Sequence, residues 1–278
     1  MAKNKSAGSS RDTVRQAQAN QLAAEKRRSR IITWTIVGVV AAVVAIIVVV
    51  TLMNSSRSIP DAGPTPTAAT ETGGLLLEDG APAEGNAPEE VDATQVDEPN
   101  PDTAGQMPTD VPGSDEADII IYADANCVYC AQFESENADA LDELAADGHT
   151  IEYRLVNYLD NPGTENYSSR AANAMACVAE ESPEHTSEYI HAVFTSYNTH
   201  QGAGLSNDEL VSLAGEIGAD IEGCVSDNTF RPFVNYTTAH AVKDGIAGTP
   251  SIWVNGEYYE NTGGGESFQS WAESQLAD

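Results

Sequence analysis

The feature that most constrains this chain is an uninterrupted apolar block from Ile31 to Met53, 23 residues without a charge. At about 1.5 Å per residue, a helix of this length spans roughly 34 Å, enough to cross a bilayer. A cleaved signal peptide is the alternative, but its apolar region is usually only about 7–15 residues long. The sequence therefore predicts an uncleaved signal anchor, a transmembrane helix over residues 31–53.

Charge is distributed unevenly around this block. Residues 1–30 hold eight Lys and Arg and two acidic residues, whereas the 278-residue chain holds 13 Lys and Arg against 43 Asp and Glu. Basic residues before an apolar segment keep that side in the cytoplasm. We therefore expect a single-pass cell-membrane protein with a cytoplasmic basic tail (1–30) and an extracytoplasmic C-terminal domain. The net charge of −30 excludes a nucleic-acid binder built on basic patches.

Residues 54–116 are rich in Pro, Ala, Gly, Thr and acidic side chains. They hold nine of the chain's 13 prolines, and 14 acidic residues against the single cation Arg57. Such a segment buries too little apolar surface to fold by itself, so we predict an extended acidic linker. Residues 73–78, with three consecutive leucines, are the exception. They could be a strand docked on the folded domain, and the sequence leaves open whether they join a sheet.

Residues 117–278 are expected to form an α/β domain. An apolar strand at 118–122, a helix at 127–146 and an alternating strand at 150–156 make a βαβ beginning. Helical patterns follow at 166–181, 185–198, 207–217 and 231–244. The chain closes with a strand at 251–254, an Asn-Gly turn, a strand at 257–259 and a helix from about 265. This order predicts a sheet built from both ends of the domain around a helical insertion.

The motif Cys127-Val-Tyr-Cys130 follows the first predicted strand and opens the next helix. A cysteine in the first turn of a helix faces free backbone N–H groups and the positive end of the helix dipole, which stabilise its thiolate. One turn later, Cys130 can close a disulfide with Cys127 or attack a mixed disulfide formed there. We therefore interpret the pair as redox-active. A structural disulfide and half of a zinc site are the alternatives, although Cys177 and Cys224 do not form a second closely spaced pair.

Gly248-Thr249-Pro250 directly precedes the strand at 251–254. Proline removes a backbone donor and is costly beside a central strand. A cis Thr249–Pro250 peptide would turn the chain tightly and present the Thr249 backbone to a bound peptide. Because only about 5–6% of X-Pro bonds are cis, this prediction depends on the Cys-x-x-Cys motif upstream.

The strand, Cys127-Val-Tyr-Cys130-Ala-Gln-Phe-Glu134, the helical insertion and the segment 248–256 together resemble a DsbA-type thiol-disulfide oxidoreductase with a thioredoxin fold, over about residues 117–278. The resemblance implies that Cys127 is the exposed nucleophile and that Cys130 resolves. It also implies that Thr249 and a cis Pro250 line the substrate groove.

Two further residues gain a role from this resemblance. Phe133-Glu134 matches the Phe-Glu that often follows the second cysteine, where the acid helps proton transfer to the buried thiol; a solvated helix acid is the other interpretation of Glu134. Val128-Tyr129 lacks the proline and histidine common in strongly oxidising relatives. The reduction potential is therefore open.

The remaining cysteines are expected to form a structural disulfide, Cys177–Cys224. If Cys127 pairs with Cys130, this pairing alone remains, and some DsbA-like proteins join their helical insertion in this way. Two buried free thiols are the alternative. We interpret the histidines as helix-surface or packing residues, because none is spaced with an acid or cysteine as in a Cys-His protease; they are residues 149, 185, 191, 200 and 240. No metal or cofactor is expected.

These observations predict a membrane-tethered, extracytoplasmic thiol-disulfide oxidoreductase that oxidises the cysteines of exported polypeptides and works with an unidentified redox partner. A disulfide isomerase or reductase of the same fold is the first alternative. A non-catalytic envelope binding module that keeps structural disulfides is the second. The sequence names neither the substrates, nor the redox partner, nor the oligomeric state.

Overall fold

The computed structural model describes residues 59–99, 108, 111, 117–260 and 267–277. The predicted cytoplasmic tail (1–30) and transmembrane helix (31–53) lie outside these ranges. Of the helices within the ranges, none is long and apolar enough to cross a membrane.

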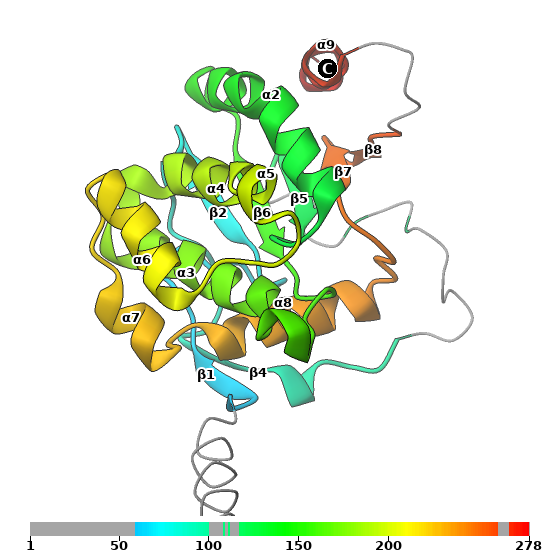
Figure 1. The fold of residues 1–278 in the computed structure, drawn as a ribbon. Coiled ribbons are helices and arrows are strands. Elements are labelled where there is room, and N and C mark those ends of the chain that lie inside the picture. The colour runs from blue at the N-terminus through cyan, green and yellow to red at the C-terminus, as the bar shows by residue number, and fades with distance from the viewer. Residues whose placement is uncertain (1–58, 100–107, 109–110, 112–116, 261–266, 278) are drawn as a thin grey trace, which may run out of the picture. The chain divides into compact units, whose positions relative to one another are not determined.

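A six-stranded mixed sheet runs through the domain in the order β3-β2-β6-β5-β7-β8 (Figure 1). Its strands are β2 (Leu75–Glu78), β3 (Ala81–Pro82), β5 (Ile119–Ala123), β6 (Ile151–Leu155), β7 (Ser251–Val254) and β8 (Glu257–Tyr258). The central strand β5 is parallel to β6 and antiparallel to β7. As the sequence predicts, the sheet joins the two ends of the domain.

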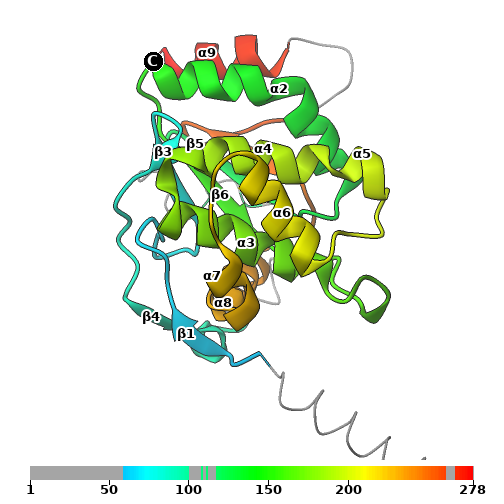
Figure 2. The same cartoon turned by 60° about the vertical axis from the view of Figure 1, so that its left-hand side comes forward.

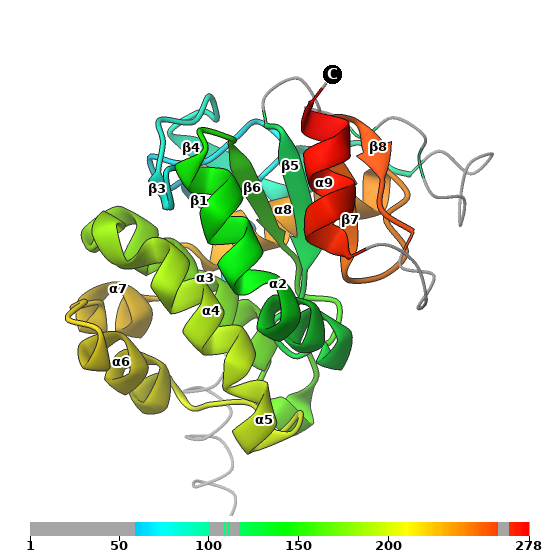
Figure 3. The same ribbon diagram turned by 90° about the horizontal axis from the view of Figure 1, so that it is seen from above.

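Helices cover both faces of this sheet (Figure 3). One face lies under α2 (Val128–Ala146) and α9 (Phe268–Leu276), and the other lies against α8 (Arg231–Lys243). Residues of β5 alternate between the two apolar cores, with Ile119 and Ile121 in the larger one and Ile120 and Tyr122 in the smaller. A strand buried on both faces has no polar side, which explains its continuous apolar run.

In chain order, the helical insertion follows β6 and precedes α8. Figure 2 shows its helices. It consists of α3 (Tyr167–Glu181), α4 (Thr186–Thr195), α5 (Tyr197–His200), α6 (Asn207–Glu216) and α7 (Glu222–Asp227). Every helix predicted within residues 117–278 is found, with the one expected at 185–198 divided into α4 and α5. The short helix α7 was not predicted, because its six residues are too few to show a helical period.

The linker prediction is wrong for residues 59–99, which fold onto the domain. There β1 (Ala62–Pro64) pairs with β4 (Glu90–Asp92), while β2 and β3 extend the large sheet. Residues 73–78, left open by the sequence, thus supply a strand antiparallel to β6. The folded unit consequently spans 59–278 rather than beginning at 117. An acidic, proline-rich segment cannot build a core alone, but it needs little apolar area when it pairs with the edge of an existing sheet.

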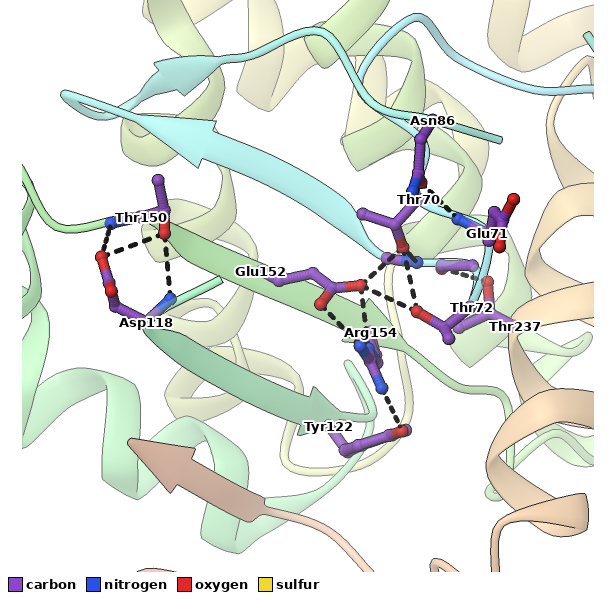
Figure 4. A network of polar contacts seen from close by, with 12 residues as sticks. Thr70, Glu71, Thr72, Asn86, Asp118, Tyr122, Thr150, Glu152, Arg154 and Thr237 are labelled. Carbon is purple, nitrogen blue, oxygen red and sulfur yellow. Dashed lines mark hydrogen bonds and ion pairs between the residues drawn. The ribbon is translucent and has the colours of Figure 1, made fainter. Parts of the chain in front are cut away.

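A buried polar network holds this added edge (Figure 4). Arg154 donates to both carboxylate oxygens of Glu152, at 2.8 and 2.7 Å, and to Tyr122 Oη at 2.7 Å. Thr70 and Thr72 of the N-terminal segment also donate to Glu152. Because a buried charge is costly unless its hydrogen bonds are filled, the N-terminal segment completes the solvation of this ion pair.

Candidate active site

The two cysteines of the motif lie where the central strand passes into α2. Cys127 is the N-cap residue of α2, and Cys130 lies in its first turn. Both are free thiols. Their order of burial is as expected, but Cys127 is itself only 7% exposed, against 2% for Cys130. The exposed residues of the motif are instead Val128 (47%) and Tyr129 (66%).

The loop before β7 lies against Cys127, which explains this low exposure. The Thr249–Pro250 peptide is cis. Cys127 Sγ lies 3.3 Å from the backbone oxygen of Thr249, to which it donates as a thiol, across 122 positions of the chain. The two residues expected to line a substrate groove are therefore brought to the first cysteine.

The surroundings of the two thiols give them opposite acidities. A hydrogen bond from Cys130 is the largest cause that lowers the pKa of Cys127, to about 5. Burial opposes it, and hydrogen bonds from the Thr249 side chain and from the backbone amides of Cys130 and Tyr129 add to it. Burial raises the pKa of Cys130 well above its usual range, and its hydrogen bond to Cys127 adds to the rise. At neutral pH the site therefore holds a Cys127 thiolate beside a protonated Cys130.

Asp124 is a buried carboxylate beside this pair that the sequence analysis did not select. It is 0% exposed and accepts hydrogen bonds from Asn126 N (2.8 Å), Leu159 N (2.9 Å) and Ser168 Oγ (2.6 Å). Burial raises its pKa to about 6 despite these hydrogen bonds. The sequence does carry a signal, since an acid stands three positions before the first cysteine at the end of an apolar strand.

Glu134, the second candidate acid, is 2% exposed, so its interpretation as a solvated helix acid is wrong. Its Oε1 accepts from Tyr153 Oη at 2.9 Å and lies 2.5 Å from His191 Nδ1. His191 is correspondingly more than a helix-surface or packing residue. No spacing in the sequence indicated this pair, because its members are 57 positions apart on different helices.

Comparison with known proteins identifies the family of this chain. A thioredoxin family model, described as Thioredoxin, matches residues 108–274, more than half of the chain. The chain belongs to this thioredoxin family. Among curated proteins none matches it.

Several solved structures similar to this thioredoxin-family protein are thiol-disulfide oxidoreductases. The reduced disulfide bond oxidoreductase DsbG from Mycobacterium tuberculosis is 25% identical, with a TM-score of 0.50 over 63% of this chain and 86% of that one. Reduced DsbA from the same organism has the same identity and TM-score, over 63% and 91%. Oxidised BdbD from Bacillus subtilis is 16% identical, with a TM-score of 0.52 over 78% and 100%, and shows the fold alone. The chain is a thiol-disulfide oxidoreductase of the DsbA type.

In this thioredoxin-family protein the other two cysteines form a disulfide. Cys177 of α3 and Cys224 of α7 are bonded, with their Cα atoms 5.8 Å apart. The bond joins the first and last helices of the insertion. In the described parts of the chain, no group of three or more His, Cys, Asp and Glu side chains is arranged to hold a metal ion.

Proposed function

We propose that this protein oxidises cysteine pairs of exported polypeptides through a Cys127–Cys130 disulfide, while an N-terminal helix holds it at the cell membrane. The observation that carries the proposal is the asymmetry of the two thiols. Cys127 lies at the start of α2 against the Thr249 backbone, with its pKa lowered to about 5, whereas Cys130 is buried and stays protonated.

The reaction follows from this asymmetry. A substrate thiolate attacks Cys127 Sγ of the disulfide, the Cys127–Cys130 bond breaks, and Cys130 takes up its electron pair and then a proton. A second substrate thiolate attacks the substrate sulfur of the mixed disulfide, and Cys127 leaves as a thiolate. The substrate loses two electrons and the enzyme gains them, so an oxidising partner must restore the disulfide. A low pKa makes Cys127 a good leaving group in the second step.

The direction of transfer rests on the stability of the reduced form. A stabilised thiolate makes a disulfide more readily given away. The proposed extracytoplasmic location, an oxidising compartment, also favours an oxidant. The dipeptide Val128-Tyr129 lacks the histidine that is common in strongly oxidising relatives, which favours a less oxidising reduction potential. Isomerase or reductase is therefore the second candidate activity.

The test uses the full chain in detergent, oxidised and mixed with a reduced model protein that contains two cysteines. We expect the substrate to lose its thiols and Cys127→Ala to be inactive. Reduced Cys130→Ala, mixed instead with the oxidised form of the model protein, should accumulate mixed disulfides through Cys127. Oxidation by the Cys127→Ala variant would refute the mechanism. A reduction potential near about −270 mV, that of a cytosolic reductant, would overturn the direction.

The membrane anchor and its orientation rest on residues 1–53 of the sequence. The apolar block and its basic flank support a cytoplasmic N-terminus. Protease added to intact cells should digest the C-terminal domain. A protected domain would reverse the topology.

A further inference from the structure

A chain of hydrogen bonds leads from the redox helix to the surface. Glu134 Oε1 lies 2.5 Å from His191 Nδ1 of α4. The other ring nitrogen, Nε2, lies 3.1 Å from Ser187 Oγ and 3.3 Å from Asp142 Oδ1. The side chains become more exposed outward, from 2% for Glu134 to 16% for His191 and 55% for Asp142. The path therefore joins a buried carboxylate to solvent through an imidazole.

The inner end of this path lies next to the second cysteine. Glu134 follows Cys130 by four positions in α2, and residues at this spacing are neighbours on one helix face, with Cβ atoms about 5–6 Å apart. Both are 2% exposed. Glu134 Oε1 is occupied by Tyr153 and His191, whereas Oε2 accepts no hydrogen bond from the described residues. Oε2 is thus available to the neighbouring thiol.

Asp124 is less suited to take up a proton and release it. Its two oxygens accept from two backbone amides and from Ser168, and it is 0% exposed. None of these three partners titrates near neutral pH. Hydrogen bonds among the described residues therefore give a proton on Asp124 no route outward.

The outer end opens on a hollow of about 620 Å³. Its charged lining comes from four elements, and all of it besides His191 is acidic: Asp79 of the β2–β3 turn, Asp142 of α2, Glu184 before α4 and Glu188 of α4. Burial lowers the pKa of His191, but the hydrogen bonds and charges of Glu134 and Asp142 prevail and raise it. The raised pKa of His191 favours the protonated imidazole, which has a proton to give from Nε2.

The resemblance already assigns proton transfer at Cys130 to Glu134. We propose that His191 completes this transfer, by releasing a proton to the hollow when Glu134 takes up the one that Cys130 loses in resolving a mixed disulfide. The inference rests on the proposed function, in which Cys130 attacks Cys127. His191 touches neither cysteine and acts through Glu134, so it is a positioning residue.

The step balances as follows. Cys130 gives its proton to Glu134 Oε2, and the resulting thiolate attacks Cys127 Sγ. The Cys127–Cys130 bond forms, the bond from Cys127 to the bound sulfur breaks, and that sulfur leaves as a thiolate with the electron pair. While Glu134 is ionised, His191 carries a proton on both ring nitrogens. When Glu134 takes up the proton of Cys130, His191 gives its Nε2 proton to Asp142 or to water, so one proton enters the pair and one leaves it.

The experiment separates this step from the one before it. The reduced full chain in detergent is mixed with oxidised glutathione, quenched with acid at intervals and weighed by mass spectrometry, from about pH 5.5 to 9.5. Mixed disulfide at Cys127 reports attack by Cys127, and its decay reports resolution by Cys130. The variants are His191→Gln, His191→Ala, Glu134→Gln and Asp124→Asn. His185→Gln is the matched control, because His185 also lies near acids, Glu184 and Glu188, but not near Glu134.

We expect His191→Gln to form the mixed disulfide at the normal rate and to resolve it at least about 10-fold more slowly near pH 7. This is less than the roughly 10²–10⁴-fold of a direct general acid or base, because His191 acts through Glu134. Glu134→Gln should resolve as slowly or more slowly. The defect should fade at alkaline pH, where hydroxide removes the proton of Cys130. Free imidazole should restore His191→Ala, and His185→Gln should behave as wild type.

Three results would overturn the inference. The first is normal resolution in His191→Gln at every pH. The second is slow resolution that neither alkaline pH nor imidazole restores, because that indicates a packing role. The third is slow resolution in Asp124→Asn with normal resolution in Glu134→Gln. A wild-type protein that forms no mixed disulfide at Cys127 would refute the proposed function, and the proton path with it.

Discussion

The acidity of Cys127 should depend on the side chain of Cys130. The hydrogen bond from the Cys130 thiol is the largest cause of the low pKa of Cys127, about 5. Cys130→Ala removes this donor and keeps the backbone amides of the first helical turn. A hydrogen bond to a charged group contributes about 1.5–3 kcal/mol, and one pKa unit corresponds to about 1.36 kcal/mol, so the pKa of Cys127 should rise by about 1–2 units.

Cys130→Ser is the matched control. Serine keeps a donor of similar size at the same position, so the pKa of Cys127 should stay near 5. Comparison of the two variants isolates the hydrogen bond from any effect of losing the second sulfur.

In both variants the titration reports a single thiol. Cys177 and Cys224 are bonded to each other, so Cys127 is the one free thiol left among the chain's four cysteines. Thiolate absorbance at 240 nm and the rate of alkylation by iodoacetamide, both followed against pH, then report on this residue alone. Equal midpoints for the Ala and Ser variants would refute the reasoning and assign the acidity to the helix amides instead.

Three further predictions concern the N-terminal segment, the second disulfide and pH. Gly74→Ala would place a Cβ 1.9 Å from a buried Glu152 oxygen, and should cost on the order of 3 kcal/mol in chemical denaturation. Gly215→Ala in α6, with nothing within 4 Å of its Cβ, should instead stabilise by about 0.5–1 kcal/mol. Replacing Cys177 and Cys224 by Ala should cost about 4 kcal/mol, because the bond closes a loop of 47 positions, and should lower the denaturation midpoint. The pKa of Cys127 is lowered to about 5, against about 8.5 for a cysteine in the unfolded chain. The reduced protein should therefore become more stable relative to its Cys127→Ser variant as pH rises from about 5 toward about 8.5, and should lose this advantage as pH falls through 5. Denaturation at a series of pH values measures this gain.

The redox site was predictable from the sequence because its signals are local. A strand that ends just before Cys127 and a helix that begins there define the position of the motif, and α2 has the predicted bounds to within one residue. The apolar run of β5 likewise identified the centre of the sheet. In each case a few consecutive residues determine the outcome.

Contacts between distant segments were not predictable in this way. The sequence shows that Glu134 stands four positions after Cys130, but His191 reaches it only because α4 packs on α2. The docking of residues 59–99 was missed for a related reason. Composition indicates whether a segment buries enough apolar surface to fold by itself. Strand β2 forms instead by backbone pairing with β6, which composition does not indicate.

The contact between Cys127 and the Thr249 backbone has a consequence for biosynthesis. A ribosome makes the two cysteines more than a hundred residues before it makes Thr249, and β5 waits equally long for β7. Pairings of such high sequence separation form late in folding, because a long loop must close first. A chain that is still folding therefore holds the two thiols before the backbone that lies against Cys127, and the site is complete only once its last strands are in place.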